Sequence, residues 1–252
     1  MRRRAAQVLL LSVLALAGCG GAKSDEDAVR DAVRSSFQST DPADCAPGNS
    51  QTAAFLRQVT FASPSVQDLY EQRCRANPTR FAATEVSVAA VKVTGDAADA
   101  TFHATGGQYA FARATAALKK SDGRWRLDRL ESVRLDRPAY DRRQAQLASG
   151  VGGLSAADAA CFSRRLAKVA DAALERAIVA AQPAVFADAF LVCFIRPELR
   201  KGGLTLSATR CVVVRLRRDP ERLMRLVFGG TKSAQRTLQR DVARAARSCT
   251  AR

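Results

Sequence analysis

The first half of the chain changes from a helical to a strand-like hydrophobic pattern near residue 83. Val29, Val33 and Phe37 are spaced four residues apart, which predicts a helix over 27–37 with one apolar stripe. Two further helices are predicted over 51–59 and 63–75, after chain-breaking segments rich in Pro, Gly and Asn. Beyond residue 83, apolar and polar residues nearly alternate, which indicates strands. These strands are predicted over 85–93, 98–104, 110–118 and 124–130.

Short turns separate these strands. Gly95-Asp96 follows the first strand, and Ser121-Asp122-Gly123 is a hairpin turn before the last. Over 124–130 the alternation is strict, with Trp125, Leu127 and Arg129 on one side. Helices followed by an antiparallel meander predict an α+β domain over 25–135.

The segment that contains this hairpin, Lys-Lys-Ser-Asp-Gly-Arg-Trp-Arg-Leu over 119–127, resembles the nuclear transport factor two superfamily. The resemblance covers about 110 residues, and the domain is most similar to the members of that superfamily that lipoproteins carry. It implies helices packed on a curved antiparallel sheet, a cone that encloses a cavity. Some members are isomerases or cyclases and many are binding domains, so the cavity would hold a small apolar ligand.

Three residues of this domain are candidates for acid–base chemistry in such a cavity. His103 alternates with Phe102, so it faces water if Phe102 faces the helices. Tyr109 follows two glycines and is expected on a loop, and Asp128 alternates with Arg126, which favours a surface ion pair. None matches a family catalytic position, so we predict no catalytic residue. The alternative is an isomerase- or lyase-like enzyme with His103 or Asp128 as the base.

The second half of the chain is predicted to be helical. A polar linker is expected over 136–153, ending in a glycine-rich segment, and a helical domain over 154–252. Gly-Leu, Ser/Thr, Cys, Arg and Leu recur at an offset of 50 residues, which indicates two repeat units at about 153–200 and 203–250.

Helix boundaries in the two units follow from capping residues and prolines. Ser155 caps a helix whose apolar stripe continues to Ala177, and a second helix begins at Pro183 and ends at Pro197. The other unit has helices over 205–217, 220–228 and 233–248. The aromatic stripe of Phe186, Phe190 and Phe194 is expected in the core. This half resembles the cysteine-paired helical domains of other bacterial lipoproteins, which implies a location and no activity.

The N-terminus has the pattern of a secretory signal. Three arginines precede an apolar run over 5–17 that is too short to span a bilayer, and the run ends in Leu16-Ala17-Gly18-Cys19. This ending resembles the lipobox of bacterial lipoproteins. The resemblance implies removal of residues 1–18, acylation of Cys19 (for example with palmitate), and a flexible tether over 19–24. The membrane would then be a partner through the lipid anchor, on the outer face of the cytoplasmic membrane.

Six further cysteines are expected to form disulfides in that oxidising compartment. If the halves are separate domains, Cys45 pairs with Cys74. In the helical half, pairing within each unit joins Cys161 to Cys193 and Cys211 to Cys249, and this arrangement is preferred. The alternative pairs Cys161 with Cys211 and Cys193 with Cys249, which would connect the units. No Cys-x-x-Cys pair is present, and the chain has a single His, so we predict no metal site and no cofactor.

The net charge of +16 is concentrated in the helical half. Residues 19–150 have 18 basic and 16 acidic side chains, and 151–252 have 19 and 8. Arg236, Arg240, Arg244 and Arg247 form one basic stripe at helical spacing. The stripe is either a solvated face or a surface for anionic lipid or wall polymer. Nucleic acid is disfavoured, because this half has no Tyr or Trp to stack on bases. We therefore predict a non-catalytic binding or interaction role at the cell envelope.

Overall fold

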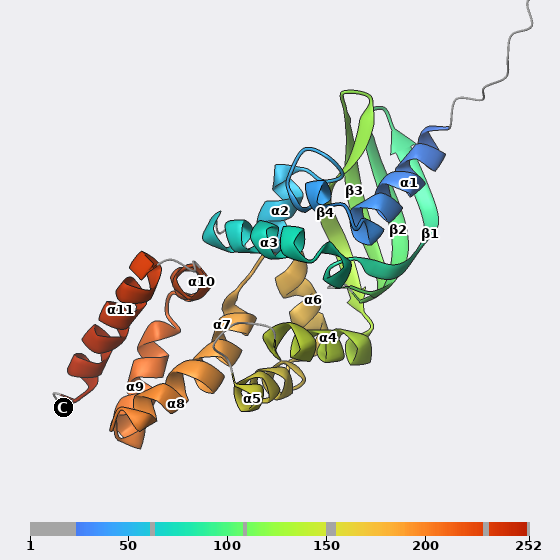
Figure 1. Ribbon diagram of the computed structural model, residues 1–252. Coiled ribbons are helices and arrows are strands. Elements are labelled where there is room, and N and C mark those ends of the chain that lie inside the picture. Colours follow the sequence, from blue (N-terminus) through green and yellow to red (C-terminus); the bar gives the residue numbers. More distant parts are fainter. Residues whose placement is uncertain (1–23, 61–63, 108–109, 150–154, 229–231, 251–252) are drawn as a thin grey trace, which may run out of the picture.

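A computed structural model describes residues 24–60, 64–107, 110–149, 155–228 and 232–250. A four-stranded antiparallel sheet forms one end of the molecule, and helices form the other (Figure 1). The sheet has the order β1-β2-β3-β4 and confirms the predicted antiparallel α+β arrangement. Its strands are β1 (Ala83–Thr94), β2 (Ala97–Gly106), β3 (Phe111–Ser121) and β4 (Arg124–Leu135).

Helix α1 lies across one face of the sheet (Figure 1). It buries the predicted stripe of Val29, Val33 and Phe37. The Ser24 hydroxyl caps the helix by accepting a hydrogen bond from the backbone N–H of Asp27 at 3.1 Å. The helices of this half are α1 (Asp25–Gln38), α2 (Ala53–Val59) and α3 (Pro64–Ala76), with 3-10 turns at Pro42–Cys45 and Pro78–Arg80.

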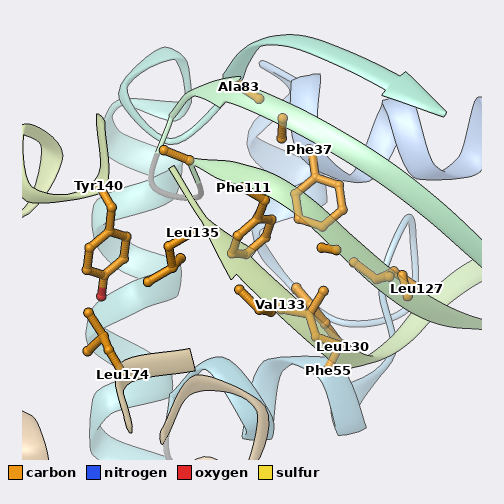
Figure 2. Packing of buried hydrophobic residues seen from close by; sticks show 14 of the residues in the cluster. Phe37, Phe55, Ala83, Phe111, Leu127, Leu130, Val133, Leu135, Tyr140 and Leu174 are labelled. Atoms are coloured by element: carbon orange, nitrogen blue, oxygen red, sulfur yellow. The ribbon is translucent and has the colours of Figure 1, made fainter. Parts of the chain in front are cut away.

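Aromatic side chains fill the space between α1 and the sheet (Figure 2). Phe37 packs against Phe102 with ring centroids 4.8 Å apart, and against Phe55 and Phe111 at 6.3 Å. All four side chains are buried. Close-packed rings at these distances stabilise the core through buried area and edge-to-face contact.

Strand β4 departs from the strict alternation that its sequence predicts. Leu118 pairs with Leu127 and Ala117 with Arg129, so Asp128 is an extra residue in β4. This bulge reverses the facing of the residues that follow it, since side chains alternate along a strand. Leu127 and Leu130 are therefore both buried, whereas Arg129 is exposed. The prediction that Arg129 shares a side with Leu127 is wrong.

The second half is helical, as predicted. Its elements are α4 (Arg137–Ser149), α5 (Ala156–Leu166), α6 (Asp171–Val179), α7 (Ala184–Phe190), a π-helical turn (Leu191–Ile195), α8 (Arg196–Lys201), α9 (Leu206–Leu216), α10 (Pro220–Phe228) and α11 (Lys232–Thr250). Ser155 and Thr205 cap α5 and α9 by accepting backbone N–H bonds from Asp158 and Ala208.

The single helix predicted between Ser155 and Ala177 is interrupted over 167–170. Arg137 supplies the physical reason. Its guanidinium donates to the carbonyl oxygens of Leu166 and Val169, groups at the end of α5 and in the interruption, and also to the Asp171 carboxylate at 2.6 Å. These bonds satisfy carbonyls that an unbroken helix would have paired internally. Periodicity could not reveal the break, because its stabilising partner lies about 30 residues away.

Pro197 does not end the helix that begins near Pro183, contrary to the sequence prediction. The chain stays helical to Lys201 because it widens into the π-helical turn just before the proline, where the Arg196 N–H donates to the Leu191 carbonyl. A proline inside an α-helix clashes with the carbonyl four residues earlier. The wider turn accommodates Pro197 without a chain break.

The two segments predicted as repeat units contain helices of matching length. Helices α5 and α9 are both 11 residues long and begin 50 residues apart, and α6 and α10 are both 9 residues long. The disulfides Cys161–Cys193 and Cys211–Cys249 each close one unit, as preferred from the sequence, and Cys45–Cys74 closes the first half.

Residues 137–149, predicted as part of a polar linker, form helix α4 instead. Tyr140 anchors this helix: its ring is buried, and Figure 2 shows it beside Leu174 of α6. Burial raises the pKa of the Tyr140 hydroxyl well above its ordinary value. One hydrophobic cluster extends from Val29 on α1 to Met224 on α10. The division of the chain into two domains stays a prediction, because the two halves share this core.

Helix α11 joins the main hydrophobic cluster only through the partly buried Leu238 among the described residues, and its Ala245 packs in a small cluster with Leu199 and Val212. The Cys211–Cys249 disulfide joins it covalently to α9. The double variant Cys211→Ser/Cys249→Ser is expected to lose about 4 kcal/mol of stability in the chain-entropy model, for a sequence separation of 38. Hydrogen exchange should show α11 amides losing protection relative to those of α1.

The control for that variant is Cys45→Ser/Cys74→Ser, which removes the disulfide that closes a loop of similar length, with a sequence separation of 29. It should lower stability by a comparable amount and leave the protection of α11 relative to α1 unchanged. Equal loss of α11 protection in both variants would mean that the Cys211–Cys249 bond has no local role.

Candidate binding surface

The structure describes two of the three acid–base candidates, His103 on β2 and Asp128 on β4, and does not bring these two together. His103 lies on the face of β2 opposite the buried Phe102, as predicted, and its Nδ1 is 3.1 Å from the Ala112 carbonyl oxygen. It therefore points away from the aromatic core between the sheet and α1. Tyr109 lies outside the described residues, as does Cys19.

Asp128 is buried and is not the surface ion-pair residue that the sequence predicts. Its carboxylate accepts a hydrogen bond from the Thr52 hydroxyl at 3.0 Å and lies 3.2 Å from Lys119 Nζ. Thr52 is also the N-cap of α2. The bulge at Asp128 directs this carboxylate toward α2, so Asp128 connects the sheet to that helix. In the described part of the chain, the Asp128 carboxylate is engaged by contacts that join elements of the fold, an arrangement that differs from a base beside an oxyanion donor.

The described part of the sheet does not favour a small apolar ligand either. The side chains that would line a cone-shaped cavity, including Phe37, Phe102 and Phe111, contact one another instead. Their ring centroids are 4.8–6.3 Å apart, the spacing of packed aromatic cores.

The basic stripe on α11 is exposed to solvent along its whole length. Arg236, Arg240, Arg244 and Arg247 are all exposed, and none has a carboxylate within ion-pair distance among the described residues. Figure 1 shows α11 at the end of the molecule opposite the start of α1. Helix α11 is therefore remote from the start of α1.

A groove lies beside this stripe, between the C-terminal part of α9, α10 and α11. Its volume is about 340 Å³. The lining combines apolar side chains with arginines. The apolar members are Leu216, Leu223, Leu226, Leu238 and Ala245, and the basic members are Arg215, Arg218, Arg222 and Arg244. Sequence reasoning found the stripe and missed the groove.

Two carboxylates also line the groove, and both are already engaged. Asp241 accepts a hydrogen bond from the Arg222 guanidinium at 2.9 Å, which raises the pKa of Arg222 above its ordinary value. Asp219 accepts from the backbone N–H of Arg222 at 2.9 Å and so caps α10. In the described part of the chain, Arg215, Arg218 and Arg244 have no carboxylate within ion-pair distance.

The described residues contain no cluster of His, Cys, Asp or Glu suited to a metal ion. No single described helix is long and apolar enough to span a membrane. Helix α6 and the segment Ala184–Lys201 together meet the length and composition criteria, but they are bent by 115°. The chain matches no protein-family model, no curated protein and no solved structure.

Proposed function

We propose that this protein is a lipid-anchored cell-envelope protein that binds an anionic wall polymer through the arginine stripe of α11. The observation that carries the proposal is the exposure of four arginines on one helix without acidic partners among the described residues. Polyanions bind such a stripe because each neutralised site releases counterions, an effect that high salt weakens. The role is binding, and no residue is assigned to catalysis.

The position of α11 favours wall polymer over the lipid of the membrane that holds the anchor. The six-residue tether over 19–24 spans at most about 21 Å, which keeps the start of α1 close to the membrane. Because α11 lies at the end of the molecule opposite the start of α1 (Figure 1), it is farthest from that membrane when the long axis of the molecule is perpendicular to the membrane. Electrostatic attraction to lipid head groups decays within a Debye length of about 8 Å.

The triple variant Arg236→Gln/Arg240→Gln/Arg247→Gln tests the proposal. With about 1 kcal/mol for each basic residue near an anionic surface, binding should weaken tenfold to about a hundredfold. The measurement is co-sedimentation of a chain beginning at residue 20 with wall sacculi that retain their anionic polymers. The same sacculi after acid extraction of those polymers should bind little protein.

The matched control removes three exposed arginines elsewhere, in Arg57→Gln/Arg113→Gln/Arg165→Gln, and so has the same net charge. It should bind sacculi within about twofold of the wild type, since electrostatic contacts are short-ranged at physiological salt. Equal weakening in both variants would show that only net charge matters. Binding to vesicles with 30% anionic phospholipid, but not to sacculi, would reject the wall polymer in favour of lipid.

A further inference from the structure

The groove between α9, α10 and α11 differs from the arginine stripe in its chemistry. Its apolar lining would not be needed to bind a hydrated polymer, whose backbone is polar throughout. Leucines from all three helices contribute partly exposed side chains: Leu216 from α9, Leu226 from α10 and Leu238 from α11. The groove therefore offers an aliphatic chain a surface on which to leave water.

The charges around the groove favour an anion over a cation. Asp219 and Asp241 are engaged by Arg222, through its backbone N–H and its guanidinium. Arg215, Arg218 and Arg244 keep their charges without a described carboxylate partner. A negatively charged head group would be complementary to these three guanidinium groups, which bind carboxylates and phosphates through paired N–H donors.

The walls of the groove are held in place by the rest of the fold. The Cys211–Cys249 disulfide joins α9 to α11, and Leu223 and Met224 bury the inner face of α10 in the main core. A preformed site loses less conformational freedom on binding than one that must close around its ligand. The volume of about 340 Å³ lies at the lower end of the range for small-molecule sites.

We propose that this groove binds a single-chain amphiphile, with its anionic head group held by Arg215, Arg218 and Arg244 and its aliphatic chain on the leucines. The site would take a fatty carboxylate or an alkyl phosphate. It goes beyond the proposed polymer binding, because a free small molecule occupies the groove and only Arg244 belongs to both surfaces.

Isothermal titration of a chain beginning at residue 20 with decanoate, below its micelle concentration, tests this site. Saturable binding of one decanoate per chain is expected. Decyltrimethylammonium has the same chain with the opposite charge, and acetate has the head group without the chain. Both should bind at least tenfold more weakly. Decyl phosphate tests the second head group. Its affinity should be similar to that of decanoate if the arginines recognise only the negative charge of the head group.

Variants locate the binding on the chain. Arg218→Gln/Arg244→Gln should weaken decanoate binding at least tenfold, and Leu238→Gln should weaken it while leaving acetate binding unchanged. The control Arg236→Gln/Arg247→Gln removes two charges of the same helix outside the groove and should leave the affinity within twofold. Absence of saturable decanoate binding, or equal weakening by the control, would overturn the proposal.

The same variants distinguish this proposal from the proposed function. Loss of sacculus binding in the triple variant tests the stripe without altering any residue that lines the groove. Decanoate binding therefore succeeds or fails independently of polymer binding.

Discussion

Replacing Phe111 with alanine is expected to destabilise the whole protein by about 3–5 kcal/mol. The Phe111 ring is fully buried and contacts Phe37 and Phe102, so the substitution leaves a cavity in the aromatic core. Urea unfolding under oxidising conditions should shift its midpoint by about 1–2 M. The fluorescence of Trp125, the only tryptophan, reports on the sheet, and far-ultraviolet circular dichroism reports mainly on the helices.

The urea midpoints of the fluorescence and circular dichroism transitions should shift by the same amount, because the hydrophobic cluster joins the sheet to α10. The control is His103→Ala on the opposite face of β2, with an expected change of at most about 0.5 kcal/mol. A circular dichroism transition that stays in place while the fluorescence transition moves would show two independently folding domains. That outcome would support the boundary between two domains that the sequence predicts over 136–153.

Replacing Cys19 with alanine is expected to abolish lipid attachment completely. The thiol is the acceptor of the diacylglyceryl group in the lipoproteins that Leu16-Ala17-Gly18-Cys19 resembles, and cleavage follows acylation. The variant should therefore incorporate no labelled palmitate and should keep residues 1–18. Both results can be measured by metabolic labelling and by the intact mass of the protein.

The control for this experiment is Cys45→Ser. It loses one half of a disulfide and should keep the lipid label, because Cys45 is bonded to Cys74 in the folded protein. Without lipid on wild-type Cys19, the envelope location and the orientation argument for the stripe would both be wrong. The decanoate site would be unaffected by that result, since its lining residues lie within 215–248, far from Cys19 in the sequence.

Local signals in the sequence were sufficient to predict most elements. The stripe of Val29, Val33 and Phe37 located α1, and Asp122-Gly123 located the hairpin between β3 and β4. Both residues of this turn have positive φ, at 52° and 73°, a conformation for which the Asp-Gly sequence is typical. The capping residues Ser155 and Thr205 located α5 and α9. Each of these signals acts within a few residues of the chain.

The features that could not be predicted depend on distant partners. The bulge at Asp128 is stabilised by Thr52, 76 residues earlier, and the break after Leu166 by Arg137. The groove needs three helices at once, so no single helical pattern reveals it. In the sequence, the groove arginines within 215–222 contribute to the excess of basic residues in the second half of the chain. Their closeness to Arg244 appears only when α11 packs beside α9 and α10.

The order of the disulfides along the chain has a consequence for how the protein matures. In each bonded pair, the partner of the first cysteine is the next cysteine along the chain: Cys74 after Cys45, Cys193 after Cys161, and Cys249 after Cys211. A chain that enters an oxidising compartment N-terminus first can therefore form each native bond before the next pair emerges. Cys19 is the exception, since its thiol emerges before Cys45 and could capture it. Acylation would remove that thiol from exchange, so the lipid would also protect the pairing order of the remaining six cysteines.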